Sequence, residues 1–208
     1  NGLPRHDWEA LLAEAKRRAD AAGHFRYPFP KRFGGRDGNN LGMAVIREHL
    51  TSKGLGLHCD LQNEHAIVGN NISLLLMLEY GSPAQQAEWI EPLASGSAMF
   101  AFGITEPNHG SDATHMESTA VHDGQGWIVN GEKTWNTGIH TATHDLIFAR
   151  NAGKAGDADG ITAFLMPTDA PGFRIEEMLW TFNMPTDHGR VSFRSEEHTS
   201  ELQSRYVI

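Results

Sequence analysis

Cysteine, basic charge and long apolar runs are all scarce in this 208-residue sequence. The single cysteine, Cys59, cannot form an internal disulfide and fits a reducing compartment such as the cytoplasm. The formal net charge of −9, with 12 histidines counted as neutral, provides no basic field to attract nucleic acid. The longest apolar candidate, Ile72 to Leu78, is far shorter than the roughly 18 residues that a membrane-spanning helix needs. We therefore expect a soluble, cytoplasmic protein that spans no membrane and binds no nucleic acid.

Signals for targeting and for phosphate binding are missing as well. The chain starts at Asn1 without an initiator methionine, and its first residues lack the regions of a signal peptide, so we expect a cut N-terminus. Neither the Gly34-Gly35 pair nor the segment Gly153 to Gly160 has the Gly-x-Gly-x-x-Gly or Walker pattern between a strand and a helix. Both segments are therefore expected to be connectors.

Helical periodicity dominates residues 1–97. From Asp7 to Ala22, apolar residues recur at three-and-four spacing, with Asp7 placed as an N-cap and Gly23 as a stop. Further helices are expected at Leu41–Lys53, Glu64–Tyr80 and Ser82–Leu93, the last with a capping box between Ser82 and Gln85.

The pattern changes at Met99, where short segments rich in β-branched and aromatic residues begin to alternate with turn residues. Such regular short strands predict an antiparallel barrel or sandwich over residues 98–193. Asn130-Gly131 predicts a type I′ turn in a hairpin from Trp127 to Trp135. The expected strands are Met99–Thr105, Ser118–His122, Gly126–Asn130, Lys133–Asn136, Asp145–Arg150, Ile161–Met166, Phe173–Met178 and Arg190–Phe193.

The last segment, residues 194–208, differs from both preceding regions. It is mostly polar, has no structural period, and begins where the strand from Arg190 should still continue. It resembles a translated sequencing adapter. We therefore expect a helical domain at 1–97, a β-domain at 98–193 and a non-native tail at 194–208.

Two signatures in the β-region could form a site for a flat, polar ligand. In the loop Thr105 to Asp112, proline, glycine and short polar side chains can turn backbone N–H groups outward. In the second signature, Asn130 to Gly138, Trp135 and Thr137 alternate along an expected strand and are predicted to share one face. An indole wall beside a hydroxyl suits a heteroaromatic ring, although an ordinary turn and a core tryptophan explain the same residues.

Together the two signatures resemble those of the acyl-CoA dehydrogenase family. The matching runs are Thr105-Glu106-Pro107-x-x-Gly110-Ser111-Asp112 and Asn130-Gly131-x-Lys133-x-Trp135-x-Thr137-Gly138. The resemblance extends over about residues 5 to 193. It implies an α+β protein in which a helical domain, a β-domain and a C-terminal four-helix domain enclose FAD, with the four-helix domain missing from this chain.

The resemblance also implies an activity and residue roles. The family oxidises the Cα–Cβ bond of an acyl-CoA thioester, passes electrons to an electron-transfer flavoprotein or a similar acceptor, and forms homo-oligomers. No catalytic base is transferred, because the family's carboxylate lies in the four-helix domain, and Glu106 is interpreted as holding its loop. The implied cofactor-binding residues are Phe102, Ile104, Thr105, Ser111, Trp135, Asn136 and Thr137, with Ser111 also touching the pantetheine arm of the substrate.

Other functions remain open at this stage. The same fold supports acyl-CoA oxidases and flavin-dependent monooxygenases. As a fragment without its base, the chain is expected to be inactive alone, so a non-catalytic binding or assembly role is a further alternative. His109 with His115, and His140 with His144, raise the possibility of zinc, but no HExxH glutamate accompanies them and no metal is predicted.

Overall fold

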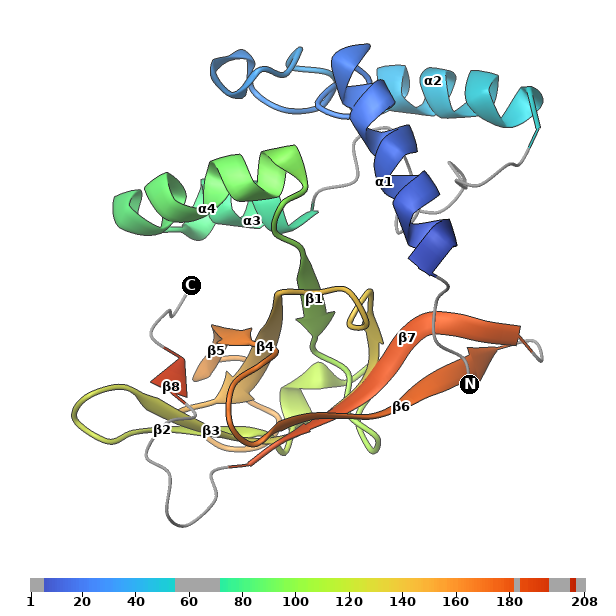
Figure 1. Cartoon of the computed structure of the whole chain (residues 1–208). Helices are drawn as coiled ribbons and strands as arrows, with labels where there is room; N and C mark the ends of the chain where they lie inside the picture. The colour runs from blue at the N-terminus through green and yellow to red at the C-terminus, as the bar shows by residue number, and fades with distance from the viewer. Residues whose placement is uncertain (1–5, 55–71, 182–183, 195–202, 205–208) are drawn as a thin grey trace.

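The structure, a computed structural model, describes residues 6–54, 72–181, 184–194 and 203–204 of the chain. Helices come first in this part of the chain and strands follow, which confirms the expected α+β class (Figure 1). The helical part ends with Ser95 and the first strand begins at Phe100. Among the described helices, none is long and apolar enough to cross a membrane.

The helical part has local end signals that the sequence predicts. Gly23 follows the first helix in a left-handed conformation (φ 76°), whereas Asp7, expected as its N-cap, lies inside the first turn. The capping box at Ser82 is confirmed, because its hydroxyl accepts from Gln85 N–H while its own N–H donates to the Gln85 side chain. Residues 64–71 of the expected core helix lie outside the described residues. The described helices are α1 (His6–Ala21), α2 (Asn40–Ser52), α3 (Ile72–Tyr80) and α4 (Pro83–Ser95).

The β-domain is built on a mixed sheet rather than a purely antiparallel one. Strand β4 pairs in parallel with β1, through Phe100 and His144, and with β2, through Thr119 and Arg150, while the other described pairings are antiparallel. The sheet order is β1-β4-β2-β3-β7-β6, with β5 on β4 and β8 on β3. The strands are β1 (Phe100–Gly103), β2 (Thr119–His122), β3 (Trp127–Thr137), β4 (His144–Arg150), β5 (Ile161–Pro167), β6 (Phe173–Thr181), β7 (Met184–Phe193) and β8 (Gln203–Ser204).

The predicted hairpin at Asn130-Gly131 is wrong, because β3 runs without a turn from Trp127 to Thr137. Its first half pairs with β2 and its second half with β7. Gly131 is required for a different reason: a Cβ there would lie 2.1 Å from Ser118 Oγ and 2.9 Å from Ser118 Cα. Gly131 therefore allows close approach of the neighbouring chain where β3 passes from one partner strand to the next.

Strand β7 begins at Met184, six residues before the predicted start at Arg190. Residues Gln203 and Ser204, within the tail expected to be non-native, pair with β3 as β8. Two apolar clusters make up the described core. One fills the β-domain, and the other joins α3 and α4 to the strands through Leu74, Met77, Leu93, Phe100 and Leu146. The helical part is thereby packed onto β1 and β4.

Candidate flavin and acyl site

The two signatures lie side by side, as the sequence predicts. The backbone N–H of Thr134 donates to the carbonyl oxygen of Thr105 over 2.9 Å. One residue earlier in β3, the Lys133 ammonium donates to the carbonyl oxygen of Ile104 over 3.3 Å. The loop after β1 is thus fastened along β3 immediately before Trp135.

Trp135 lies on a β-bulge with an unusual backbone conformation. Between the Lys133–Val191 and Asn136–Gly189 pairs, two residues of β3 oppose one residue of β7. Trp135 has φ 63°, a left-handed value that costs a side-chain-bearing residue about 1–2 kcal/mol. Its surface is nevertheless 46% exposed, so it is not a core tryptophan. Backbone strain of this kind concentrates at functional sites, where other contacts hold it in place.

The bulge also changes which side chains of β3 point inward. Val129 and Lys133 are buried before the bulge, and Asn136 is buried after it, so the inward positions shift from odd to even numbers. As a result, Trp135 is exposed while its neighbour Asn136 is fully buried. Of the Asn136 groups, the backbone is therefore the one that could contact a cofactor.

Thr137 lies next to a histidine that the sequence does not identify. Its Oγ1 lies 2.9 Å from His188 Nδ1, and the direction of that hydrogen bond depends on the His188 tautomer. The His188 ring packs edge-on to Trp135 with centroids 6.1 Å apart. Gly138 N–H donates to the Asp187 carbonyl oxygen over 2.8 Å, which fixes the end of β3 against β7. The exposed indole and the hydroxyl are thus held in one small unit.

Glu106 holds the loop from within the core, and its predicted role is confirmed. Its carboxylate accepts from the backbone N–H groups of Glu117 (2.5 Å) and Ser118 (2.9 Å) and from Lys133 Nζ (2.8 Å). Burial acts to raise the Glu106 pKa, but the three hydrogen bonds outweigh it and the pKa lies below its ordinary value. Glu106 therefore remains ionised, paired with Lys133 and turned away from solvent.

A second buried polar pair lies directly beneath the Trp135–Thr137 segment. Asn136 Nδ2 donates to Asp145 Oδ2 over 2.5 Å, and both side chains are fully buried. Burial raises the Asp145 pKa to about 7, opposed by the Asn136 hydrogen bond and by the Lys133 charge. A Cβ on Gly103 would lie 2.9 Å from Asn136 Nδ2 and 3.1 Å from Asp145 Oδ1, so a larger residue on β1 would displace this pair.

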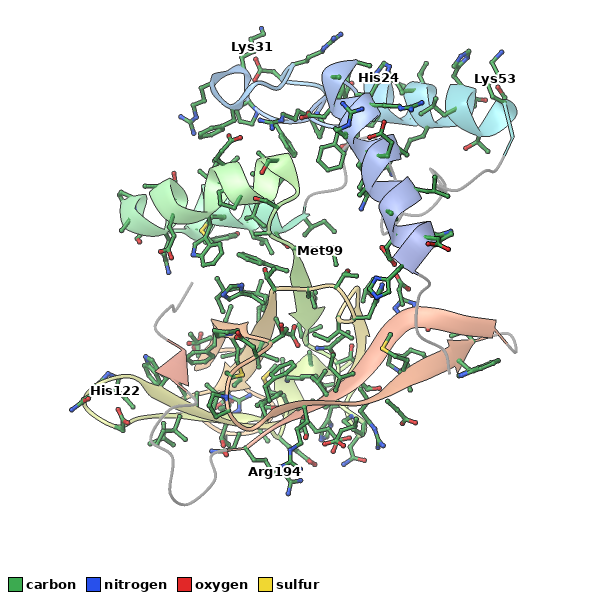
Figure 2. The ribbon with its side chains drawn as sticks, in the orientation of Figure 1. His24, Lys31, Lys53, Met99, His122 and Arg194 are labelled. Atoms are coloured by element: carbon green, nitrogen blue, oxygen red, sulfur yellow. The ribbon has the colours of Figure 1, made fainter. Side chains whose placement is uncertain are left out.

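An apolar cavity of about 380 Å³ opens between the helical part and the β-domain. This volume is within the range of small-molecule sites. Met99, labelled in Figure 2, lies at the junction of the two parts and borders the cavity. Of the predicted site residues, Phe102 and Thr137 are among its described lining residues, and Phe102 is 38% exposed. The other apolar lining residues are Trp8, Leu12, Phe25, Ile72, Leu93, Ala98 and Phe100.

Three further predicted residues, Ile104, Thr105 and Ser111, lie on the loop after β1. Ile104 and Thr105 are half-buried, and their carbonyl oxygens are bonded to β3. Ser111 is exposed at the far end of the loop. The next residue, Asp112, accepts from Thr114 N–H (3.2 Å) and lies 2.8 Å from His115 Nδ1. These contacts fix the end of the loop next to Ser111.

The histidines considered for zinc each have another partner. His109 and His115 stack with ring centroids 6.2 Å apart and contact carboxylates, and His144 packs on Trp89 at 4.6 Å. His140 Nε2 lies 3.2 Å from Glu9 Oε1. Within the described ranges, no group of three or more histidine, cysteine, aspartate and glutamate side chains could hold a metal ion.

The residues that this chain contributes around Trp135 have the chemistry that a flavin needs. Trp135 presents an exposed aromatic face at a strained bulge, and Thr137 presents a hydroxyl beside it at the cavity wall. A planar ring needs an aromatic wall and hydrogen-bonding groups near its polar edge. This fold and site define a two-part helical and β protein with an exposed indole next to a threonine that borders an apolar pocket.

Comparison with known proteins identifies the family. The model of the acyl-CoA dehydrogenase N-terminal domain matches residues 5–97, and the model of the middle domain matches residues 101–195. The chain therefore belongs to the acyl-CoA dehydrogenase family, a family of flavoprotein oxidoreductases. Human mitochondrial short-chain specific acyl-CoA dehydrogenase is 31% identical over 170 residues, which cover 81% of this chain and 40% of the human protein.

Further relatives agree with this assignment. Acyl-CoA dehydrogenase FadE12 of Mycobacterium tuberculosis is 29% identical over 155 residues, covering 74% of this chain and 38% of FadE12. The acyl-CoA dehydrogenase structure from Geobacillus kaustophilus has a TM-score of 0.72 and 24% identity, covering 97% of this chain and 52% of the other. The FAD complex of PigA has a TM-score of 0.75 at 21% identity, covering 99% and 58%. These two structures show the shared fold. The chain spans about two fifths of the length of the human enzyme and of FadE12.

Several residues of the site were not identified from the sequence. His188 and Glu9 are not among the predicted site residues, and Glu9 lies on the first expected helix, Asp7 to Ala22. Two signals were available. Lys133 is four residues after the apolar Val129, so the two point to the same face of a continuous strand, and Asp145 directly precedes the apolar run Leu146 to Ala149. Charged residues at such inward positions indicate a buried polar network.

Proposed function

We propose that this chain provides the flavin wall and the acyl pocket of an FAD-dependent acyl-CoA dehydrogenase that oxidises the Cα–Cβ bond of an acyl-CoA thioester. The observation that supports this most strongly is Trp135, which is exposed although its backbone is strained. Thr137 next to it borders an apolar cavity. A residue that serves only the core has no reason to combine strain with exposure.

FAD is the cofactor that these residues fit. Trp135 would cover one face of its ring, Thr137 would bond near the polar edge, and the backbone around Ile104, Thr105 and Asn136 would offer further partners. When bound, FAD supplies the acceptor for the hydride from the substrate Cβ. Preorganised donors from this chain stabilise negative charge that develops at the edge of the ring.

The chain's own residues bind and shield the acyl group. Phe102, Phe100 and Leu12 contribute apolar surface to the cavity, which excludes water from the reacting carbons. Ser111 would contact the pantetheine arm. No catalytic residue is assigned within the described residues: the base that takes the α proton would be a carboxylate positioned by hydrogen bonds near the thioester. The electron acceptor would be an electron-transfer flavoprotein or a similar protein, and the intact enzyme would be a homo-oligomer.

The direct test uses protein from the intact reading frame, supplied with FAD, straight-chain and branched acyl-CoAs, and an artificial electron acceptor. We expect enoyl-CoA to form in step with reduction of the acceptor, with little oxygen consumed. Oxygen consumption that matches product formation would indicate an oxidase, and insertion of oxygen into the product a monooxygenase. Failure to bind FAD, or failure to form enoyl-CoA from any substrate tested, would overturn the proposal.

Residues 1–208 by themselves are expected to bind FAD weakly or not at all and to show no turnover. In this chain Trp135 has an exposed face. The family models match its N-terminal and middle domains, whereas the base is expected in the four-helix domain. Gel filtration of the chain after incubation with FAD measures the retained flavin. Retention at one equivalent per chain would contradict the expectation.

A further inference from the structure

The β-bulge at Trp135 decides which side chains of β3 face the core. Before it, Val129 and Lys133 are buried, and after it Asn136 is buried. If β3 alternated without the bulge, Trp135 would occupy the next inward position and Asn136 would point outward. An exposed Trp135 and a buried Asn136 are therefore two consequences of one backbone feature.

The bulge is not favoured by the residues that form it. Trp135 has φ 63°, a left-handed angle that is unfavourable for a residue with a side chain. Its outward indole forgoes burial of apolar surface, and the buried amide of Asn136 loses its hydrogen bonds with water. These costs require a contact that exists only when the bulge is formed.

Asp145 on β4 provides that contact. Its Oδ2 accepts from Asn136 Nδ2 over 2.5 Å, and both side chains are fully buried. Asn136 Oδ1 and Asp145 Oδ1 are buried without a hydrogen-bond partner in the described part of the chain, so the amide of Asn136 depends on this one bond. An outward Asn136 could not make the bond, because Asp145 lies in the core.

The surroundings leave the pair little freedom. Strand β1 runs beside β4 (Figure 1), and a Cβ on its Gly103 would lie 2.9 Å from Asn136 Nδ2 and 3.1 Å from Asp145 Oδ1. Lys133, the buried cation of β3, is engaged by Glu106 over 2.8 Å. Asp145 is thus the described group that holds the Asn136 amide in the core.

We propose that Asp145 is a positioning residue of the site: by holding Asn136 in the core it keeps the bulge formed and thereby turns Trp135 outward as a ligand wall. Asp145 is fully buried and touches no ligand itself. Its consequence for FAD rests on the proposed function, whereas its control of the orientation of Trp135 does not. A purely structural Asp145 would affect the stability of the fold but not the exposure of one indole.

The test measures the exposure of Trp135 in the 208-residue chain. All five tryptophans are replaced by 5-fluorotryptophan, and the fluorine NMR signal of Trp135 is assigned with Trp135→Phe. The change of this signal between ordinary and heavy water reports its contact with solvent. Asp145→Leu should shift the signal and reduce its solvent effect, because the unpaired Asn136 turns outward and the indole inward. Asp145→Asn, which keeps an oxygen acceptor for Asn136, should retain the wild-type signal.

A compensating substitution separates position from stability. When Asp145→Leu is combined with Asn136→Leu, an apolar side chain occupies the inward position without needing a partner, so the Trp135 signal should return. Phe164→Leu, a core substitution on β5, controls for general loss of stability and should leave the signal unchanged. Circular dichroism confirms that each variant is folded. If Asp145→Leu does not fold, Asn136→Ala removes the same bond, offers little apolar surface to hold the inward position, and carries the same prediction.

In the intact protein, Asp145→Leu should weaken FAD binding about tenfold, and Asp145→Asn should not. A wild-type Trp135 signal in folded Asp145→Leu, or in folded Asn136→Ala, would overturn the inference. A shifted signal together with wild-type affinity for FAD would uphold the control of Trp135 by Asp145 and contradict the cofactor role of Trp135. A shifted signal in a chain whose intact parent binds no FAD would contradict only the proposed function.

Discussion

Lys133 Nζ lies 2.8 Å from Glu106 Oε1, and the two side chains are 0% and 4% exposed. The pair connects β3 to the loop that carries the first signature. Lys133 also donates to the Ile104 carbonyl oxygen, and Glu106 accepts from two backbone N–H groups further along the loop. One buried ion pair therefore fixes the loop relative to Trp135, two residues away on β3.

Lys133→Met should destabilise the protein strongly. It leaves the Glu106 carboxylate buried without its cation, a change that costs about 3–5 kcal/mol. Chemical unfolding monitored by circular dichroism measures the loss. The double variant with Glu106→Gln removes the uncompensated charge and should recover part of it. A loss below about 1 kcal/mol for Lys133→Met would show that the pair is not essential to the fold.

Asp145 predicts a specific pH dependence of stability. Its folded pKa is raised from 3.8 to about 7, so the folded state binds a proton that the unfolded state releases. This contribution is fully present below pH 3.8 and is lost as the pH rises toward 7. A pKa change of this size corresponds to about 4 kcal/mol.

The Asp145 prediction is tested by measuring the unfolding free energy of wild type and Asp145→Asn across this pH range. The difference between them should change in favour of Asp145→Asn as the pH rises, because asparagine does not ionise. Comparing the two proteins cancels the opposite contribution of Glu106, whose lowered pKa stabilises the fold above its ordinary pKa. A difference that does not vary with pH would contradict the assignment.

Trp135→Gly should weaken FAD binding with little change in the stability of the fold. Glycine relieves the left-handed strain at φ 63°, and this relief offsets the packing that a half-exposed indole provides, so stability should change by no more than about 1 kcal/mol. Loss of the aromatic wall should weaken FAD binding by the intact protein about tenfold. Fluorescence titration with FAD measures this, and Trp180→Leu, an exposed position on β6, is the control. A large loss of stability with unchanged FAD affinity would identify Trp135 as a structural residue.

Gly131→Ala should destabilise the protein by about 1–3 kcal/mol, the usual cost of overpacking. A Cβ at this position meets Ser118 Cα at 2.9 Å, so the backbone must shift. Thermal unfolding measures this loss, and Gly124→Ala is the comparison. A Cβ on Gly124 would meet no atom within 4 Å, so that variant carries only the cost of its backbone angle, φ 98°. Ser118→Gly removes the Oγ and Cβ contacts at 2.1 and 2.6 Å but keeps the Cα, so it should recover part of the stability lost in Gly131→Ala; no recovery would contradict close approach as the cause.

The sequence predicted those features that depend on local chemistry. The capping box at Ser82, the stop at Gly23 and the change from helices to strands near Met99 follow from patterns within a few residues. Glu106 was also expected to hold its loop, and its hydrogen bonds to the N–H groups of Glu117 and Ser118 confirm this. The two signatures were expected to lie side by side, and the Thr134–Thr105 hydrogen bond confirms this.

Features that depend on distant pairing were not predicted. Asn130-Gly131 has the composition of a tight turn, but β3 continues because it has two partner strands, β2 and β7, which no local pattern reveals. The bulge at Trp135 likewise arises from the register between β3 and β7. It places Asn136 in the core beside Asp145 instead of on the surface with its neighbours. The roles of Ile104, Thr105, Ser111, Trp135 and Thr137 toward FAD remain predictions.

Anaerobic absorption spectroscopy of the intact, FAD-loaded protein tests the central claim most directly. The flavin bands of the wild type should bleach on addition of an acyl-CoA, since the hydride from the substrate is transferred to the flavin. Trp135→Gly and Thr137→Val should bleach more slowly or less completely, while Trp180→Leu should behave as the wild type. Flavin bands that no acyl-CoA changes, or bleaching that the Trp135 and Thr137 variants leave unaffected, would contradict the account.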